Sequence, residues 1–288
     1  MNGYLMLIFS TIVMSYDFCL DKQYQRMAGT SMRVGLNYNI IWGLVEAVIF
    51  FAINGFKLAI TPFSIIMASI FALCVMAYKI IGLKILKKGG ISLYTMFLMT
   101  GGMMVPYVYG LIVLNESFSL LQFIGLIVVL IAVVMAYYSA VTLSKKLLFL
   151  CVLVFFVNGI TSVVTKVHQI ETVMAVVSSM ELLILTSILR SIFAAAAYPF
   201  AVKSDSEKSP LTIKSTSVII ASALICCISN MINFTYAKTV PATVLYPIIT
   251  GGTILFSLIA NKIIFKETAT KKMVMAVVLC IIGLLLFL

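Results

Sequence analysis

Long apolar runs separated by short polar segments dominate the chain. Ten such runs lie near residues 4–20, 34–54, 61–82, 91–114, 118–139, 147–165, 173–200, 215–237, 241–264 and 273–288. Each run is long enough to cross a hydrocarbon core of roughly 30 Å as an α-helix. Only the segment 203–210, KSDSEKSP, has the composition of a linker. The pattern therefore predicts an all-α polytopic membrane protein with ten transmembrane helices.

Composition and charge support the same class. The chain is 63% hydrophobic and only 10% charged, whereas roughly a quarter of the residues in a soluble domain are charged. The net charge of +11 comes from Lys and Arg in the short segments between the runs, where basic residues act as a topology signal. We therefore expect a multi-pass protein of the cell membrane, surrounded by the lipid bilayer and without a nucleic-acid partner.

The second half of the chain repeats features of the first. The shared features are a Thr-Gly-Gly triplet, an acidic residue after it, small residues in the last run, and a Lys and a Gln after the first run. They are Thr100, Gly101 and Gly102 against Thr250, Gly251 and Gly252; Glu116 against Glu267; Gly125 against Ala276; Ala132 against Gly283; and Lys22 and Gln25 against Lys166 and Gln169. An internal duplication explains these coincidences. It predicts two five-helix repeats, 1–142 and 143–288, within one integral-membrane unit.

The two repeats are expected to be inverted. Because five is an odd number, the second repeat must enter the membrane in the opposite sense to the first. Inverted repeats are a transporter architecture, in which a site near the midplane opens to each side in turn as the halves rock. The sequence therefore predicts a central substrate site and alternating access.

The end of the chain resembles a known family. The segment NFTYAKTVPATVLYPIITGGTILFSLIANKIIFKETATKKMVMAVVLCIIGLLLF looks like the closing helices of the EamA-like, ten-helix branch of the drug/metabolite transporter (DMT) superfamily. In that family each half ends with a helix leading into a glutamate, then a helix with small residues seven apart. Here these are Glu116 with Gly125 and Ala132, then Glu267 with Ala276 and Gly283. The resemblance implies a secondary carrier of small metabolites, commonly an exporter of amino acids or related compounds.

Ionisable residues inside the apolar runs are candidates for function, because charge is costly in a membrane. They are Glu46, Glu181, Arg190 and, nearer an interface, Asp17. Two helical faces gather polar residues: Asn39, Trp42 and Glu46 on the second predicted helix, and Ser179, Thr186 and Arg190 on the seventh. An offset of 144 residues maps Glu46 onto Arg190. The pair is expected either to face a central cavity or to tie the halves together structurally.

Glu181 has two interpretations. It cannot share a helix face with Arg190, which lies nine residues later. In a low-dielectric site its carboxyl group could bind and release a coupled proton. Alternatively it faces a polar neighbour and stays unreactive. The loop acids Glu116 and Glu267 are expected to cap helix starts, where a carboxylate satisfies amide donors.

Aromatic residues and helix breakers complete the predicted site. Trp42, Tyr107, Tyr236 and Tyr246 could offer a π surface to an organic solute or cation. Helix interruptions facing a cavity are expected at Asn158-Gly159, Pro106-Tyr107 and Tyr246-Pro247. The two Thr-Gly-Gly triplets are expected to let helices of the two halves pack closely.

The sequence favours no enzyme chemistry. The six cysteines lie in or beside apolar runs and are expected to act as small apolar fillers. His168 is the single histidine and is expected in a solvated loop, which excludes a histidine metal cluster. No stretch matches a phosphate-binding G-x-x-x-x-G-K-[ST], an H-E-x-x-H or a G-x-S-x-G motif, so no metal site, bound cofactor or catalytic residue is predicted. An integral-membrane enzyme is therefore the less favoured alternative. Another is a small-cation or multidrug exporter, which in related four-helix proteins depends on a glutamate midway along the first helix, where this chain has only Asp17 near the end.

We thus predict a secondary active transporter that exports a small organic metabolite such as an amino acid. The identity of the substrate, import against export, a coupled proton or other ion, and monomer against dimer stay open. Most Lys and Arg residues, Lys79 included, fall on one side of the predicted topology, leaving Lys57, Lys166 and Lys238 on the other. This bias predicts that both termini lie outside, whereas the family resemblance implies termini inside.

Overall fold

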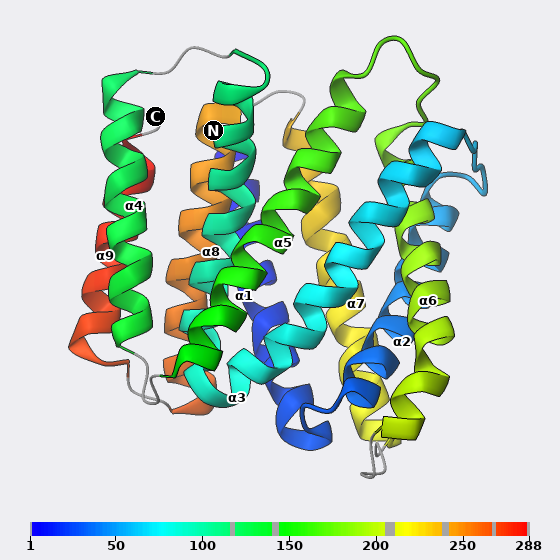
Figure 1. Ribbon diagram of the computed structural model, residues 1–288, viewed down its shortest axis with the longest axis horizontal. Coiled ribbons are helices and arrows are strands. Elements are labelled where there is room, and N and C mark those ends of the chain that lie inside the picture. The colour runs from blue at the N-terminus through cyan, green and yellow to red at the C-terminus, as the bar shows by residue number, and fades with distance from the viewer. Residues whose placement is uncertain are drawn as a thin grey trace.

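Helices make up almost the whole of the computed structural model, which describes residues 2–115, 119–139, 144–204, 211–237, 242–266 and 269–286. The helices within these ranges are α1 (Asn2–Ala28), α2 (Met32–Ile53), α3 (Pro62–Ile112), α4 (Leu120–Tyr138), α5 (Lys145–Ile170), α6 (Ser179–Ser204), α7 (Ile213–Ala237), α8 (Ala242–Phe265) and α9 (Lys271–Leu285). No strand occurs in the described ranges. Figure 1 shows the helices running up and down one bundle, and the all-α expectation is confirmed for these residues.

Gly90 divides α3 into two parts. Its φ of 74° and ψ of 180° are not helical, and glycine adopts a positive φ without the steric penalty of a side chain. In Figure 1 the first part of α3 descends to the lower end of the bundle and the second part rises again. The break falls between the third and fourth apolar runs of the sequence.

The two ends of the bundle differ in charge. Both chain termini lie at the upper end in Figure 1, which we call the terminal end. At the opposite end the chain passes from α1 to α2, turns at Gly90, and passes from α4 to α5, from α6 to α7 and from α8 to α9. Basic residues gather near these connections, and we call this the basic end. Examples are Arg26, Arg33, Lys87, Lys145, Lys214 and Lys271.

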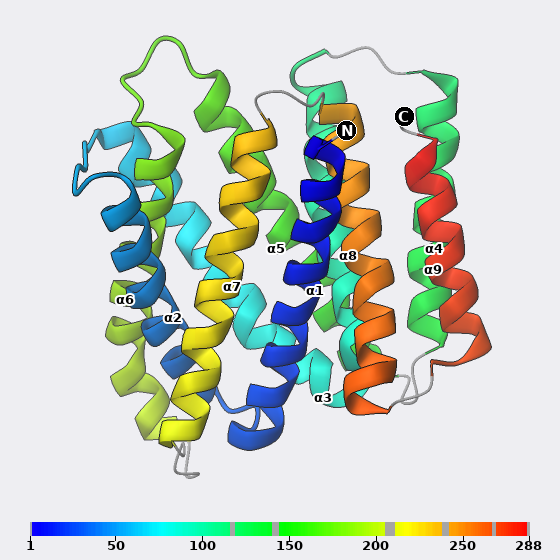
Figure 2. The same cartoon turned by 180° about the vertical axis from the view of Figure 1, so that it is seen from behind.

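Helices from distant parts of the chain lie side by side. Helices α4 and α9 pack together at one edge of the bundle, and α2 and α6 pack together at the other (Figures 1 and 2). Between these edges, α1 packs on α7 and α8, while α5 packs on α3. The interior of the bundle is therefore built from both halves of the chain.

Small polar side chains set the starts of several helices. Ser31 accepts a hydrogen bond from the Val34 amide at the start of α2. Ser119 and Gln122 form a reciprocal capping box at the start of α4. These contacts satisfy amide groups that have no partner within the helix. The helix starts are thus specified locally, before any packing.

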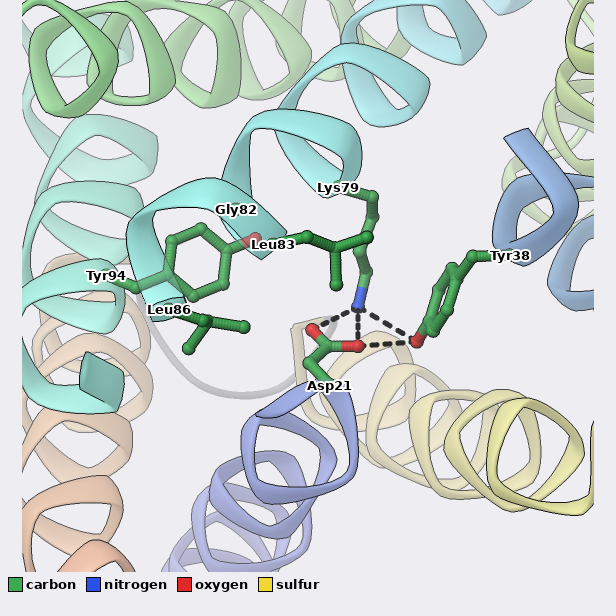
Figure 3. A pocket seen from close by; sticks show the side chains of 7 residues that line it. All are labelled: Asp21, Tyr38, Lys79, Gly82, Leu83, Leu86 and Tyr94. Atoms are coloured by element: carbon green, nitrogen blue, oxygen red, sulfur yellow. Dashed lines mark hydrogen bonds and ion pairs between the residues drawn. The ribbon is translucent and has the colours of Figure 1, made fainter. Parts of the chain in front are cut away.

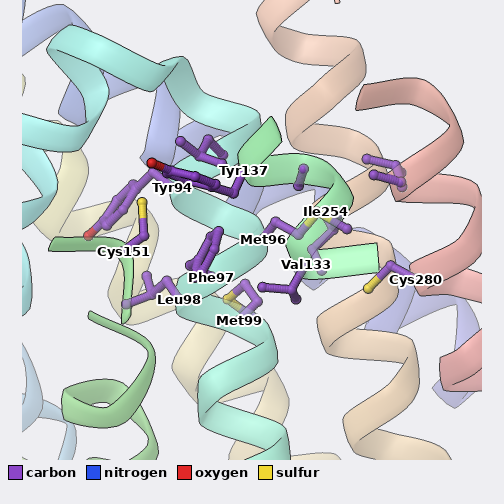
Figure 4. Close-up of a cluster of buried hydrophobic side chains, with 14 of the residues drawn as sticks. Tyr94, Met96, Phe97, Leu98, Met99, Val133, Tyr137, Cys151, Ile254 and Cys280 are labelled. Carbon is purple, nitrogen blue, oxygen red and sulfur yellow. The ribbon is translucent and has the colours of Figure 1, made fainter. Parts of the chain in front are cut away.

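The largest buried apolar cluster surrounds the second part of α3 (Figure 4). Its members include Tyr94, Phe97 and Met99 of α3, Val133 of α4, Cys151 of α5, Ile254 of α8 and Cys280 of α9. All six cysteines are free thiols. Cys151 and Cys280 are fully buried in this cluster, as expected for apolar fillers.

Two glycines of the repeated triplets allow close contact between the halves, as predicted. A Cβ atom at Gly101 would overlap the carbonyl oxygen of Phe155, so α3 and α5 touch backbone to backbone. A Cβ atom at Gly252 would lie 2.8 Å from the Thr11 Oγ1 atom, so α8 and α1 are almost as close. Small residues permit such approaches between membrane helices.

Large apolar side chains also cover the outer faces of the bundle. On α4, for example, Leu120 is 74% exposed and Ile131 is 50% exposed. Among the described residues, seven helices are long and apolar enough to cross a membrane: α2, α3, α4 and α5 over their whole length, and most of α6, α7 and α8. Helix α1 carries four charged side chains, and the described part of α9 has 15 residues. The chain has the surface and helices of a multi-pass membrane protein.

The three expected helix interruptions are not found. Helix α5 continues through Asn158-Gly159, α3 continues through Pro106-Tyr107, and α8 continues through Tyr246-Pro247. A single glycine or proline is tolerated within such helices when neighbouring groups satisfy the backbone. In α5 the Asn158 amide instead donates to the Leu98 carbonyl of α3 at 2.7 Å, which ties two continuous helices together.

His168 is not in a solvated loop as expected. Helix α5 extends beyond the predicted run, and His168 lies buried in its last turn. The His168 Nε2 atom lies 2.9 Å from the Ser64 hydroxyl of α3, and its ring stacks on Phe63. The predicted run 147–165 ends before Lys166, whereas the helix packs against α3 and continues to Ile170. The predicted caps Glu116 and Glu267 lie outside the described residues.

Candidate functional site

A cavity of about 190 Å³ lies inside the bundle, between helices of both halves. Its walls come from α1, α2, α3, α5, α6 and α7. The polar residues that line it are Glu46, Asn158, Thr161, Thr165, Gln169, Ser179, Thr186, Ser187, Arg190 and Asn230. Hydroxyl and amide groups in a bundle of apolar helices give the cavity the chemistry of a site for a polar solute.

Glu46 and Arg190 form an ion pair on the cavity wall. The Arg190 Nη2 atom lies 2.6 Å from Glu46 Oε2, and the Ser187 hydroxyl donates to the same oxygen at 3.2 Å. Both side chains are buried, where each charge needs a partner because desolvation is costly. The predicted pairing is confirmed, and both residues line the cavity.

Trp42 joins this pair to a second group of charges. The Arg190 guanidinium carbon lies 3.9 Å from the centre of a Trp42 ring, and Lys79 Nζ lies 4.5 Å from it. Such cation–π contacts are favourable when the cation is desolvated. Trp42 lines the cavity, and its indole nitrogen is buried with no hydrogen-bond partner among the described residues. The predicted aromatic residue is therefore at the site, in contact with cations of the protein itself.

The second group, which we call the charged cluster, consists of Asp17, Asp21, Tyr38, Lys79 and Ser222. Lys79 Nζ lies 2.8 Å from Asp21 Oδ2 and 3.3 Å from Asp17 Oδ2. Tyr38 donates to Asp21 Oδ1 at 2.5 Å, and Ser222 donates to Asp17 Oδ1. Figure 3 shows Asp21, Lys79 and Tyr38 converging from α1, α3 and α2. All members of the cluster are buried.

Of this cluster, the sequence predicted only Asp17 as a candidate site residue. Lys79 was expected among the basic residues at a helix end, whereas the structure buries it between two carboxylates. Asp21 was expected in a polar connection, whereas α1 continues well beyond the first apolar run. A signal was present: Asp17 and Asp21 are four residues apart and share a helix face. Lys79, a cation inside the third apolar run, is the partner that this pair of acids requires.

The charged cluster lies on the basic side of the cavity. On four helices a cluster residue is about one turn nearer the basic end than a cavity residue. These pairs are Asp17 and Met14 on α1, Tyr38 and Trp42 on α2, Lys79 and Val75 on α3, and Ser222 and Cys226 on α7. The cluster therefore forms the floor of the cavity.

The cavity extends in the other direction toward the terminal end. Its lining includes Gln169, near the end of α5, and Ser179, at the start of α6. Both helix termini lie at the terminal end in Figure 1, and Gln169 is exposed. The cavity thus reaches toward one surface and is blocked by buried charges toward the other.

Glu181 is not in the low-dielectric environment considered for it. It lies in the first turn of α6, where its carboxylate accepts hydrogen bonds from the amides of Ala59 at 2.8 Å and Ser178 at 2.9 Å. The Ser178 hydroxyl in turn accepts from the Glu181 amide. This is a helix cap with polar neighbours, away from the cavity lining. The apolar run 173–200 suggested a burial that the short connection before α6 does not provide.

Four other predicted site residues are absent from the cavity lining. Asn39 is buried one turn before Trp42 and donates to the Gly35 carbonyl of its own helix at 2.8 Å. Tyr107 hydrogen-bonds Gln122 of α4 at 3.2 Å. Tyr236 is half-buried in the last turn of α7. The backbone of Tyr246 belongs to α8, and its side chain lies outside the described residues.

Comparison with known proteins identifies the fold and no family. No family model matches the chain, and no curated protein matches it. A solved structure described as "Crystal structure of protein" is similar, with a TM-score of 0.63 and 12% sequence identity. The match covers 99% of this chain and 97% of that one. At this identity the likeness concerns the fold alone, and it extends over the whole length of both chains.

Proposed function

We propose that this protein is a secondary active transporter that moves a small organic metabolite across the cell membrane by alternating access. The observation that carries the proposal is a polar cavity with an ion pair, placed inside a bundle of apolar helices and blocked toward one end. Buried ionisable residues facing an internal cavity are typical of transport pathways in membranes. A cavity reaching toward one end only suits a carrier better than an open channel.

Packing supports an inverted repeat of five helices. If the two parts of α3 count separately, the described segments number ten. Taken in order, the five segments of the first half correspond to the five of the second: α1 to α5, α2 to α6, the first part of α3 to α7, its second part to α8, and α4 to α9. The contacts of α1 with α7 and α8 then correspond to those of α5 with the two parts of α3. In the close pairs α2–α6 and α4–α9, each helix packs against its own counterpart from the other half.

Helix directions agree with inversion. In Figure 1, α1 runs from the terminal end to the basic end, whereas α5 runs the opposite way. The same holds for α4 and α9. An inverted pair of halves can exchange conformations, which converts a cavity open to one side into a cavity open to the other.

We also propose that the basic end faces the cytoplasm, with both termini outside. Short connections rich in Lys and Arg stay in the cytoplasm, and the basic residues gather opposite the termini. Lys79 does not contribute to this bias, because it is buried in the charged cluster. In this orientation the cavity extends toward the outside, as in the last stage of export.

The substrate that fits the cavity is a small molecule with charged or hydrogen-bonding groups. Asn158, Thr186 and Asn230 supply neutral hydrogen-bonding groups beside the Glu46–Arg190 pair. An amino acid or a related compound has the matching size and polarity, and the EamA-like resemblance of the closing helices favours the same class. No bound cofactor is required, since the driving force comes from an ion or solute gradient.

Trp42 provides a direct test, because it is the only tryptophan in the chain. We expect metabolites that raise the thermal stability of the purified protein also to change Trp42 emission. Arg190→Gln should weaken their binding at least tenfold, whereas Tyr107→Phe, a change outside the cavity, should leave binding unchanged. Proteoliposomes should then transport the same compounds. Ligands that bind equally well to Arg190→Gln and the wild type, without flux, would refute the proposed function.

A further inference from the structure

With all its groups in their ordinary ionised state, the charged cluster has a net charge of one negative unit. It contains two carboxylates, Asp17 and Asp21, and a single ammonium, Lys79. All three groups are buried. Burying an uncompensated charge is so unfavourable that an ionisable group there changes its protonation state instead. The simplest way to remove the excess charge is to bind one proton.

The hydrogen bonds of the cluster also require one additional proton. Four oxygen atoms form a chain from Asp17 Oδ1 through the Ser222 and Tyr38 hydroxyls to Asp21 Oδ1. Tyr38 lies 2.5 Å from both Ser222 Oγ and Asp21 Oδ1, and Ser222 contacts Asp17. These three links need three protons, whereas a serine and a tyrosine hydroxyl carry one each. A carboxylic acid proton completes the chain. If Asp17 carries it, Asp17 donates to Ser222, Ser222 donates to Tyr38 and Tyr38 donates to Asp21, so the Ser222–Asp17 bond is reversed relative to two ionised acids. If Asp21 carries it, the three bonds run the opposite way.

Among the described residues, the surroundings of the cluster supply no other ion pair to its carboxylates. The neighbouring titratable side chains are Cys19 of α1, Tyr78 and Tyr94 of α3 and Cys226 of α7, which are uncharged at neutral pH in their ordinary state. Beyond Trp42 the Glu46–Arg190 pair is balanced within itself. Lys22, also buried in α1, lies 3.3 Å from Asn261 Oδ1 of α8 and over the Phe265 ring. The excess negative charge therefore belongs to the cluster.

A proton fits this place better than a metal ion. The pocket beside Asp21, Tyr38 and Lys79 (Figure 3) has no room for a water molecule. Lys79 already occupies the position between the carboxylates, so a metal cation would be repelled by its ammonium group. A proton shared along the chain needs neither space nor additional ligands.

We infer that the charged cluster is a proton-binding site, which holds one proton between Asp17 and Asp21 while the cavity is closed toward the basic end. Ser222 comes from α7 and the other members come from α1, α2 and α3, so the chain joins the two halves. Separation of the halves at the basic end would break the links through Ser222 and admit water. Hydrated carboxylates release a proton readily, since their ordinary pKa values are about 4. The role of this proton in coupling rests on the proposed transport function.

Infrared spectroscopy of the purified, full-length protein in lipid nanodiscs tests the inference at about pH 7, where exposed carboxyl groups are ionised. We expect the C=O stretch of a protonated carboxylic acid in the wild type. Asp17→Asn and Asp21→Asn should each lose that band, because each leaves one carboxylate for one ammonium. Glu181→Gln, a matched change at the start of α6 and outside both the cluster and the cavity lining, should keep it.

A second variant covers the case in which an Asp variant fails to fold. Tyr38→Phe removes one hydroxyl from the chain and leaves both acids, so the band should remain at a shifted frequency. Absence of the band from the wild type, or its retention in both Asp variants, would overturn the inference. So would an unshifted band in folded Tyr38→Phe. A sodium-dependent spectrum without a carboxylic acid band would instead identify a metal-ion site. No substrate enters these measurements, so their result is independent of the transport proposal.

Discussion

At the scale of single residues, the interior charges of this protein occur in sets that join different helices. Glu46 and Arg190 connect α2 with α6, and Lys79 connects α3 with two acids of α1. Trp42 contacts a cation from each set. In a low-dielectric interior such contacts are strong only while each charge keeps its partner. Trp42 is therefore the side chain through which we expect a change at one set to affect the other.

The Glu46–Arg190 pair should show strong energetic coupling. Glu46→Gln and Arg190→Gln each leave a buried charge unpaired, so each should lower the free energy of unfolding by about 3–5 kcal/mol. The double variant should lose much less than the sum of the two. Thermal or denaturant unfolding of the four proteins in the same detergent provides the double-mutant cycle. Additive losses would show that the two side chains do not interact.

At the scale of helices, two close approaches connect the halves of the chain. Gly101 places α3 against the backbone of α5, and Gly252 places α8 against Thr11 of α1. Gly90 allows the two parts of α3 to turn back on each other. A side chain at Gly101 would overlap backbone atoms, one at Gly252 would displace the Thr11 side chain, and one at Gly90 would have to adopt a positive φ.

Gly101→Ala should destabilise the bundle, because the new methyl group meets the Phe155 backbone, which cannot move aside cheaply. Overpacking of this kind costs about 1–3 kcal/mol. Gly251→Ala is the matched control, since its methyl group meets only the flexible end of Leu284 at 3.2 Å. We expect its melting temperature to be unchanged or slightly higher. Equal melting temperatures for both variants would contradict the close α3–α5 contact.

The sequence predicted much at this scale, for physical reasons. Membrane helices must satisfy their backbone groups internally, so apolar runs such as 34–54 and 118–139 correspond closely to α2 and α4. Helix ends were harder, because α1 and α5 continue past their apolar runs as polar residues find partners in the bundle. Asp21 and His168 were misjudged for this reason. The Glu46–Arg190 pair was found because a repeat offset relates the two positions.

At the scale of the whole molecule, the difference in charge between the basic end and the terminal end of the bundle indicates its orientation in the membrane. Lys57 lies after α2 at the terminal end, and Lys145 begins α5 at the basic end. Basic connections favour the cytoplasm. In the proposed inverted repeat, exchange of the conformations of the two halves would open the opposite end of the cavity, so the orientation also determines which side of the membrane the observed cavity faces.

The proposed orientation predicts the result of cysteine labelling in whole cells with a membrane-impermeant maleimide. Lys57→Cys, which is exposed at the terminal end, should react from outside. Lys145→Cys, which is exposed at the basic end, should react only after the cells are opened. Both variants are made in a background without the native cysteines. The reverse pattern would show that both termini lie in the cytoplasm.

Two-sided access to the cavity is the most direct test of alternating access. Cys226 lines the cavity and is partly exposed, so it can serve as the reporter once the other five cysteines are replaced. Right-side-out and inside-out vesicles receive an impermeant thiol reagent, with Lys57→Cys and Lys145→Cys as markers of sidedness. Our account predicts that Cys226 reacts from both sides, faster from the terminal side, and that Cys226→Ser abolishes the reaction. Reaction from the terminal side alone, at every pH and with every binding metabolite, would contradict a carrier.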